Sequence, residues 1–203
     1  MAEINTVVFD LGSVLVDWNP AYLYRKLFDK EEEVQWFLEN VTSNDWNEMQ
    51  DAGRSLAEGT RLLIEQFPEQ EEKIKAYYDR WEEMLGGPIE ETVTLLKMLR
   101  EKQNLRLYAL TNWSSETFPI ALEKYEFLHW FDGRLVSGEE KMRKPFPEIY
   151  ERLIERFDID PKRALFTDDN PRNLKPAQEM GFHTHHFQSP ATFRICLQSL
   201  HLL

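Results

Sequence analysis

"VVFDLGSVLV", residues 7–16, places Asp10 between an apolar run and Gly12. A short apolar run that ends at a turn signal is typical of a strand buried on both faces of a sheet. The chain repeats the pattern in "ALFTDDNPRN", where an apolar run ends on Asp168 and Asp169. Ligands of open parallel sheets bind outside the carboxyl ends of the strands. The two stretches therefore predict a site at one edge of a parallel sheet.

Around these stretches, short apolar runs alternate with helical patterns. The runs that predict strands are residues 4–9, 105–110, 134–136, 163–167 and 182–187. The helical patterns that separate them are "PIEETVTLLKMLREK", "SSETFPIALEKY", "PFPEIYERLIERF" and "NPRNLKPAQEMG". Strands that alternate with helices indicate an α/β fold with a parallel sheet.

Residues 18–86 interrupt this alternation, because they carry helix signals and no convincing strand. Asn19-Pro20 is a cap followed by a proline at the first helical position. Ser55 with Glu58 three residues later matches the pattern of a capping box. We therefore expect a helical insert between the first and second strands of the α/β core.

The composition excludes several classes of partner. The 203 residues include 42% hydrophobic ones, enough for a core, and the net charge is −12. An acidic chain is a poor ligand for nucleic acid or an anionic membrane, so we expect neither as a partner. The single cysteine, Cys196, lies in an apolar run and is expected to pack there. One cysteine, no run of transmembrane length and no signal-peptide pattern predict a cytoplasmic protein.

Polar side chains follow the predicted strands at the same edge of the sheet. They are Asp10, Thr111, Asn112, Lys144, Asp168 and Asp169. Each alone has a plain structural explanation, such as a helix cap for Asp169 or a solvated loop for Lys144. Asp10 is harder to explain as a turn residue, and the groups occur together in the order that a parallel sheet requires. The set indicates a metal and anion site with a carboxylate available as nucleophile.

Four segments carry a family resemblance. "VVFDLGSVLVDWNP", "YALTN", "RKPFPEIY" and "LFTDDNPRN" resemble motifs I to IV of the haloacid dehalogenase-like (HAD) hydrolase superfamily, in order and spacing. The phosphatase branch, with its hexose-1-phosphate phosphatases, is the most similar. The resemblance implies a Rossmann-like parallel-sheet core formed by residues 1–17 and 87–203, with residues 18–86 as an all-helical cap domain.

The resemblance also implies a reaction. Asp10 would attack the phosphorus of a small phosphomonoester and form an aspartyl-phosphate, which is then hydrolysed. The enzyme would depend on Mg²⁺. Thr111, Asn112 and Lys144 would be the remaining catalytic residues and would hold the phosphoryl oxygens. The partner is then a small-molecule phosphate ester, and the protein is a monomer or a homodimer.

The metal ligands follow from the same resemblance. They would be Asp10, the backbone carbonyl of Gly12, and Asp169. Asp168 is then a supporting neighbour, and Asn173 stands where many members have a second acid. Oxygen ligands of this kind suit Mg²⁺, which prefers octahedral geometry and keeps several waters.

Gly12 is the departure from the family pattern, because most of its phosphatases have a general acid two residues after the nucleophile. A positioned acid contributes roughly 10²–10⁴-fold to rate. Three explanations stay open: another donor such as Asp17, a leaving group that needs little help, such as an anomeric hydroxyl, or a non-catalytic phosphometabolite-binding protein. Glycine also occurs here in the hexose-1-phosphatase-like branch, which favours the second.

A 2-haloacid dehalogenase with the same Asp nucleophile is an alternative enzyme. Dehalogenases of the superfamily need no metal, and their fourth motif is not an Asp pair. Retention of Asp169 therefore favours a phosphatase. We expect Trp18, Trp46 and Asp51 of the cap, with Trp113 beside Thr111, to contact the small polar substrate.

Overall fold

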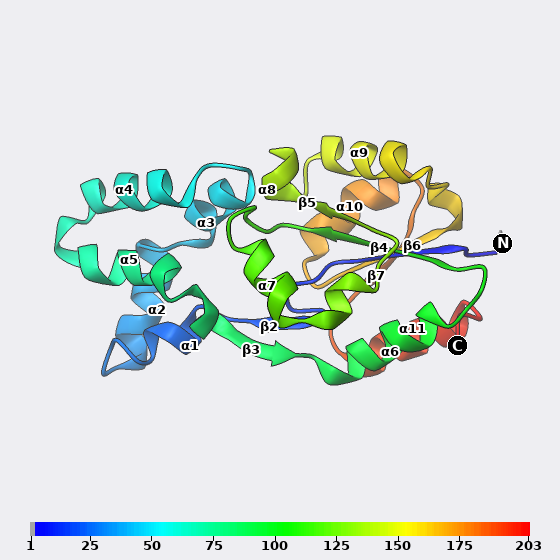
Figure 1. The fold of residues 1–203 in the computed structure, drawn as a ribbon, viewed down its shortest axis with the longest axis horizontal. Coiled ribbons are helices and arrows are strands. Elements are labelled where there is room, and N and C mark those ends of the chain that lie inside the picture. Colours follow the sequence, from blue (N-terminus) through cyan, green and yellow to red (C-terminus); the bar gives the residue numbers. More distant parts are fainter. Residues whose placement is uncertain (1–2) are drawn as a thin grey trace.

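A five-stranded parallel sheet forms the centre of the computed structural model, which describes residues 3–203 (Figure 1). The strand order is β5-β4-β1-β6-β7, and every neighbouring pair is parallel. The strands are β1 (Thr6–Phe9), β4 (Arg106–Thr111), β5 (Gly133–Val136), β6 (Ala164–Asp168) and β7 (His183–His186). All five predicted strands are confirmed, each within two residues of its expected ends. Strand β1 lies between β4 and β6, so the strand ends that carry Asp10, Thr111 and Asp168 are neighbours.

Helices cover both faces of the sheet. The helices of the α/β core are α6 (Glu90–Arg100), α7 (Phe118–Lys124), α8 (Ser137–Glu140), α9 (Pro147–Phe157), α10 (Pro171–Glu179) and α11 (Pro190–Ser199). Val7 and Phe9 pack into the cluster that contains α6, α7 and α11, whereas Val8 packs with α9 and α10. Because successive strand residues face opposite sides, the whole run 7–9 is buried and shows no polar alternation.

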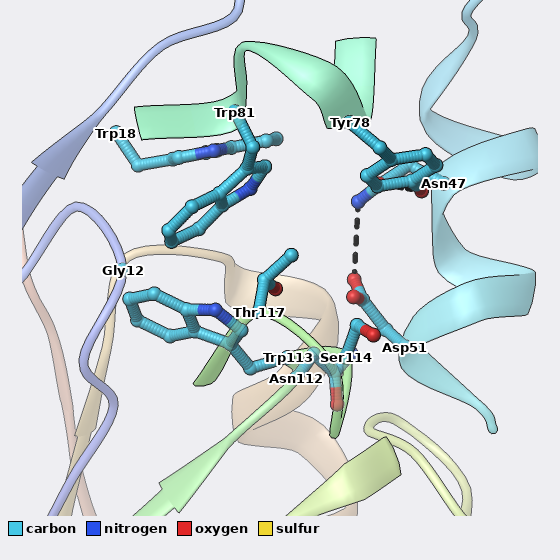
Figure 2. Close-up of a pocket in the computed structure, with 10 residues that line it drawn as sticks. All are labelled: Gly12, Trp18, Asn47, Asp51, Tyr78, Trp81, Asn112, Trp113, Ser114 and Thr117. Atoms are coloured by element: carbon cyan, nitrogen blue, oxygen red, sulfur yellow. Dashed lines mark hydrogen bonds between the residues drawn. The ribbon is translucent and has the colours of Figure 1, made fainter. Parts of the chain in front are cut away.

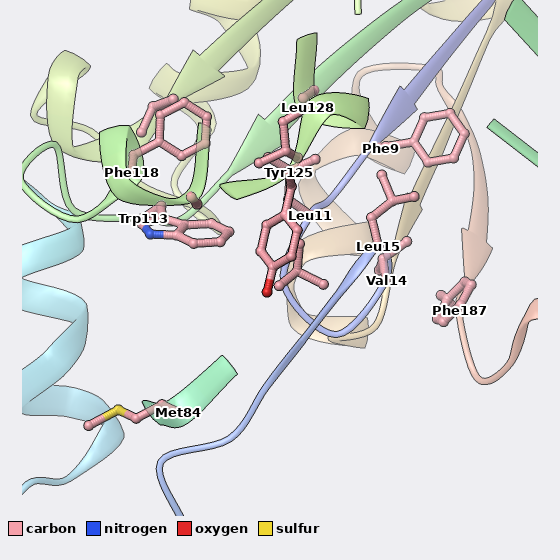
Figure 3. Packing of buried hydrophobic residues seen from close by; sticks show 14 of the residues in the cluster. Phe9, Leu11, Val14, Leu15, Met84, Trp113, Phe118, Tyr125, Leu128 and Phe187 are labelled. Carbon is pink, nitrogen blue, oxygen red and sulfur yellow. The ribbon is translucent and has the colours of Figure 1, made fainter. Parts of the chain in front are cut away.

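The larger cluster surrounds the start of the first motif. Figure 3 shows Phe9, Leu11 and Leu15 within it. The ring of Phe9 meets that of Phe193 edge to face, with centroids 5.5 Å apart. Phe193 and Cys196 belong to α11, so the apolar run around Cys196 packs as expected, and it does so as a helix.

Five helices lie between β2 (Val16–Trp18) and β3 (Leu85–Pro88), at one end of the molecule (Figure 1). They are α1 (Ala21–Tyr24), α2 (Glu31–Asn40), α3 (Asn44–Asp51), α4 (Leu56–Gln66) and α5 (Glu71–Asp79). The short 3₁₀ turns of the chain are η1 (Pro68–Gln70), η2 (Trp81–Met84), η3 (Glu126–His129) and η4 (Pro161–Arg163). We call the helical segment between β2 and β3 the cap.

The connection between cap and core corrects one detail of the sequence analysis. Strands β2 and β3 pair antiparallel, with Asp17 opposite Gly87 and Trp18 opposite Leu85. The sequence pattern predicted no strand within 18–86, yet Trp18 and Leu85 lie in strands. Strand β2 has three residues, and β3 has four that include glycine and proline, so neither shows an alternation that would reveal it.

The cap has its own aromatic core. The rings of Tyr24 and Phe37 are 4.7 Å apart, and Trp46 meets Tyr77 edge to face at 5.0 Å. The Ser55 hydroxyl accepts a hydrogen bond from the backbone N–H of Glu58, as a helix N-cap does. Along residues 3–203, every helix is too short or too polar to cross a bilayer.

Candidate active site

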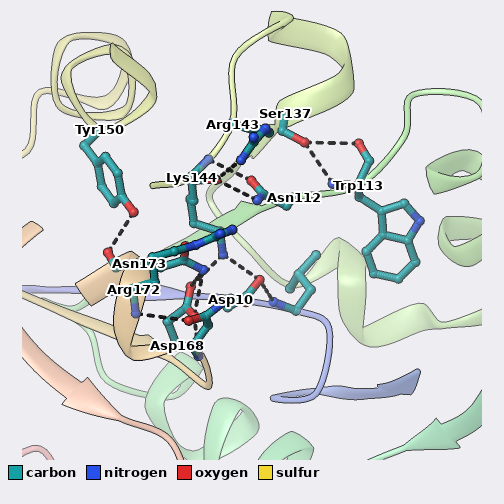
Figure 4. Close-up of polar contacts among 12 residues, drawn as sticks. Asp10, Asn112, Trp113, Ser137, Arg143, Lys144, Tyr150, Asp168, Arg172 and Asn173 are labelled. Atoms are coloured by element: carbon teal, nitrogen blue, oxygen red, sulfur yellow. Dashed lines mark hydrogen bonds and ion pairs between the residues drawn. The ribbon is translucent and has the colours of Figure 1, made fainter. Parts of the chain in front are cut away.

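Lys144 connects the acids of the first and fourth motifs. Its Nζ lies 2.9 Å from Oδ1 of Asp10 and 2.7 Å from Oδ2 of Asp168 (Figure 4). The side chains of Lys144 and Asp168 are fully buried, and Asp10 is 7% exposed. Burying three charges is costly unless they are paired and hydrogen-bonded. The arrangement holds a lysine charge against the carboxylate at the end of β1.

The ionisation of the pair follows from burial and charge. Burial raises the pKa of Asp10 well above its usual value, and the positive charge of Lys144 opposes that rise. The charges of Asp168 and Asp169 raise the pKa of Asp10 further. Burial tends to lower the pKa of Lys144, but the charges of Asp10 and Asp168 outweigh it and the net shift is upward. Lys144 therefore stays protonated at neutral pH.

Asp168 and Asp169 have different surroundings. The Asp168 carboxylate accepts hydrogen bonds from Lys144, from Asn173 Nδ2 at 3.0 and 3.1 Å, and from the N–H of Asn170 at 2.8 Å. Asp169 is partly exposed, and within residues 3–203 its carboxylate accepts no hydrogen bond from another side chain. Asp168 is thus occupied with positioning, while the oxygens of Asp169 are available to a ligand.

The acids are close enough to share a cation. One oxygen each of Asp10, Asp168 and Asp169 lies within 4.8 Å of the others. Gly12, whose carbonyl is the third expected ligand, follows Asp10 by two residues in the same loop. Carboxylate and carbonyl oxygens are the donors that Mg²⁺ takes, so the donor set fits the expected metal.

Thr111 and Asn112 are adjacent at the end of β4, but their side chains have different surroundings. The Thr111 hydroxyl is buried and has no hydrogen-bond partner among residues 3–203, so it is available to a ligand. The Asn112 side chain accepts from the N–H of Lys144 at 2.8 Å and donates to its carbonyl at 3.0 Å. The Asn112 side-chain amide therefore positions the backbone of Lys144, and its expected contact with the phosphoryl group stays a prediction.

A cavity lies beside these residues, between the core and the cap (Figure 2). The space between its lining residues is about 420 Å³ when open solvent is included, and about 60 Å³ of it is available to the centres of water-sized molecules. Its lining consists of Gly12, Trp18, Asn47, Asp51, Tyr78, Trp81, Asn112, Trp113, Ser114 and Thr117. Three indoles lie on one side of it, and Tyr78 lies on the other side with Asn47 and Asp51 of α3.

The structure brings three of the four expected substrate contacts to this cavity: Trp18, Asp51 and Trp113. Trp46 does not line it, because its Nε1–H donates to the carbonyl of Gly59 and its ring packs inside the cap. The alternative proton donor Asp17 also lies away from it, and its carboxylate accepts from the Tyr22 hydroxyl at 2.8 Å.

Five lining residues were not expected from the sequence: Asn47, Tyr78, Trp81, Ser114 and Thr117. Tyr78 and Trp81 belong to a helical apolar pattern, which predicts packing and carries no sign of a cavity. Ser114 and Thr117 follow Thr111 closely in the chain, and their proximity to it was the only available signal.

Helix α3 of the cap contacts the core through charged and polar groups. Glu48 is 7% exposed and pairs with two arginines of the core, Arg143 at 2.8 Å and Arg172. Arg143 directly precedes Lys144, and Arg172 directly precedes Asn173 (Figure 4). The cap is therefore attached to the segments that carry the site.

Comparison with known proteins agrees with this geometry. Residues 4–181 match the haloacid dehalogenase-like hydrolase family. The sesquiterpene phosphatase astK of Aspergillus oryzae is 26% identical over 176 residues, covering 86% of this chain and 85% of that protein. The pyrophosphatase PpaX of Bacillus cereus is 25% identical over 193 residues, covering 90% and 82%.

A solved structure is also similar. The HAD family enzyme bt-2542 of Bacteroides thetaiotaomicron, in complex with magnesium and inorganic phosphate, is 26% identical with a TM-score of 0.66. The similarity covers 92% of this chain and 95% of that one. With the Asp10–Lys144–Asp168 arrangement and the family match over residues 4–181, the chain belongs to the haloacid dehalogenase-like hydrolases.

Proposed function

We propose that the protein is a Mg²⁺-dependent phosphatase that hydrolyses a small phosphomonoester through an aspartyl-phosphate on Asp10. The observation that carries the proposal is the buried Lys144, held between Asp10 and Asp168 beside the unpartnered hydroxyl of Thr111. A fixed lysine charge and a free hydroxyl at strand ends form a binding site for phosphoryl oxygens. Relatives named as phosphatases, and a similar structure that holds magnesium and phosphate, support the same reaction.

In the first step, Asp10 attacks phosphorus and the bond between phosphorus and the leaving oxygen breaks. Thr111 donates a hydrogen bond from its hydroxyl to a phosphoryl oxygen, and Lys144 offsets the negative charge beside Asp10. In the second step, water attacks the phosphorus of the aspartyl-phosphate, and Asp10 is released as a carboxylate. Mg²⁺, when held by Asp10, Asp169 and the Gly12 carbonyl, would neutralise phosphoryl charge and orient the group for in-line attack.

The cavity suggests the kind of leaving group. Trp18, Trp81 and Trp113 offer flat apolar surfaces, while Asn47 and Asp51 offer hydrogen bonds. A molecule with one apolar face and several hydroxyls suits this lining, so we propose a sugar phosphate such as a hexose 1-phosphate as the substrate class.

A hydrolysis screen tests the function. Sugar 1-phosphates, sugar 6-phosphates, prenyl phosphates, pyrophosphate and aryl phosphates are compared with and without Mg²⁺, for the wild type and Asp10→Asn. Asp29→Asn, a change at an exposed acid of the cap, is the matched control. We expect Mg²⁺-dependent phosphate release that Asp10→Asn abolishes and Asp29→Asn retains.

Three results would contradict the proposal. Near-normal hydrolysis by Asp10→Asn would exclude the covalent step. Halide release from 2-chloropropionate without metal, with no phosphatase activity, would favour a dehalogenase. Tight binding of phosphorylated sugars without turnover of any phosphate ester would indicate a binding protein.

A further inference from the structure

Gly12 leaves the expected acid position without a side chain. A Cβ built on Gly12 would meet no atom within 4 Å, and its φ lies outside the left-handed region. Steric crowding therefore does not explain the glycine. If the proposed reaction occurs, the leaving oxygen must take its proton from water or from another residue of the cavity.

Two of the ten residues that line the cavity can titrate, Asp51 and Tyr78. Burial raises the pKa of the Tyr78 hydroxyl far above the neutral range, so Tyr78 does not exchange protons there. Asp17, the alternative donor from the sequence, lies outside the lining and is hydrogen-bonded to Tyr22. Among residues 3–203, Asp51 is the one carboxyl group in the lining of the cavity.

The core fixes the position of Asp51, the last residue of α3. Its backbone carbonyl accepts a hydrogen bond from the Ser137 hydroxyl at 2.5 Å, and Ser137 Oγ accepts from the N–H of Trp113 at 2.9 Å. Its carboxylate accepts a hydrogen bond from Asn47 Nδ2 at 3.2 Å. Asp51 and Asn47 lie on the side of the cavity opposite the indoles (Figure 2). Trp113 follows Thr111 by two residues, so these contacts attach Asp51 to the loop that begins at the phosphoryl site.

The surroundings suit a group that holds a proton at neutral pH. Burial raises the pKa of Asp51 to about 7, and the negative charge of Glu48 on the same helix adds to the rise. A backbone contact from Ser114 and the charges of Arg143 and Lys144 lower it. A carboxyl group with a pKa near the working pH is effective both as acid and as base.

We propose that Asp51 is the general acid of the reaction and replaces the acid that is missing at Gly12. The cap then supplies the proton for the leaving group. This inference rests on the proposed function. As the bond between phosphorus and the leaving oxygen breaks, the protonated Asp51 gives its proton to that oxygen, and the product leaves as a neutral alcohol. The Asp51 carboxylate then takes a proton from the water that attacks the aspartyl-phosphate, which restores the acid and releases phosphate.

The test compares Asp51→Asn with Asp45→Asn, a change at an exposed acid of the same helix. Each variant is assayed with Mg²⁺ on an aryl phosphate that has an acidic leaving group and on a sugar or alkyl phosphate that has a poor one. We expect Asp51→Asn to lose about 10²–10⁴-fold on the poor leaving group. On the aryl phosphate, Asp51→Asn should release the first equivalent of phenol at the wild-type rate. Later turnovers should be slower, because the variant lacks the base that activates water for hydrolysis of the aspartyl-phosphate. Asp45→Asn should match the wild type on both.

Two further measurements separate proton donation from a structural role. In the wild type, kcat/KM for the poor leaving group should fall as pH rises through about 7, the range in which the pKa of Asp51 lies, and Asp51→Asn should lose this limb. Gly12→Asp, added to Asp51→Asn, should restore part of the rate on the poor leaving group, because the position has room for a side chain.

Equal rates for Asp51→Asn and Asp45→Asn would overturn the inference and leave the proposed function intact. So would equal losses on both substrates in the first release of the leaving group, with no rescue by Gly12→Asp, because these would mean that Asp51 only holds the cap in place. Loss of the proposed function itself would show differently, as normal hydrolysis by Asp10→Asn.

Discussion

Replacing Lys144 with methionine tests the electrostatics of the site most severely. Methionine has a similar length and no charge, so Lys144→Met keeps the packing and removes a partner 2.9 Å from Asp10 and 2.7 Å from Asp168. The two carboxylates, with oxygens within 4.8 Å, would repel by ~3 kcal/mol at an effective dielectric constant of about 20. Removing one member of a buried ion pair typically costs about 3–5 kcal/mol. We expect the free energy of unfolding to fall by about that amount at neutral pH.

The loss should depend on pH in a definite direction. Lys144 lowers the pKa of Asp10, so without it that pKa rises further above the unfolded value of about 3.9. In the folded variant, Asp10 then binds more protons than in the unfolded chain. The free energy of unfolding therefore falls as the pH rises above the unfolded pKa of Asp10. The deficit relative to the wild type should be smaller near pH ~5 than near pH ~8.

Urea unfolding followed by tryptophan fluorescence, in Mg²⁺-free buffer, measures this deficit. Lys97→Met, at an exposed position of α6, is the control and should change stability by no more than about 0.5 kcal/mol. A deficit for Lys144→Met below about 1 kcal/mol, or one that grows toward acid pH, would refute the reasoning.

Asp169→Asn should keep the fold and raise the Mg²⁺ concentration for half-maximal activity, which a metal titration of activity measures. An unchanged titration curve would mean that Asp168, and not Asp169, is the metal ligand. Thr111→Val keeps the shape of a buried residue and removes its unpartnered hydroxyl. It should weaken inhibition by inorganic phosphate by about 5–10-fold, the equivalent of one hydrogen bond. Glu48→Gln should weaken the attachment of α3 to Arg143 and Arg172, seen as faster hydrogen exchange in α3 with little change in the sheet.

The sheet and the groups at its edge were predictable because their signals are local. A buried parallel strand has a continuous apolar run, and its end is visible as the first polar residue. Asp10, Thr111 and Asp168 were therefore placed correctly from the chain alone, since a parallel sheet gathers its carboxyl ends. The pairing of β2 with β3 was missed because the strands are too short to show a period.

The cap side of the site depends on contacts between distant segments. Both Trp46 and Asp51 lie on α3, and the helical period alone does not show which of them faces the core. The Ser137–Asp51 hydrogen bond, 86 residues apart in the chain, turns Asp51 toward the cavity, while Trp46 packs on Tyr77. The same limit applied to Asp17, which lies nearer to Asp10 in the sequence than Asp51 does and yet faces Tyr22.

Acid quenching during turnover tests the central claim most directly. The enzyme is mixed with Mg²⁺ and an aryl phosphate, quenched within the first turnover, and digested for mass spectrometry. The account predicts a phosphoryl group on the peptide that contains Asp10, localised to that side chain and absent in Asp10→Asn. A phosphoryl group on any other residue, or phosphate release by Asp10→Asn at the wild-type rate, would contradict it.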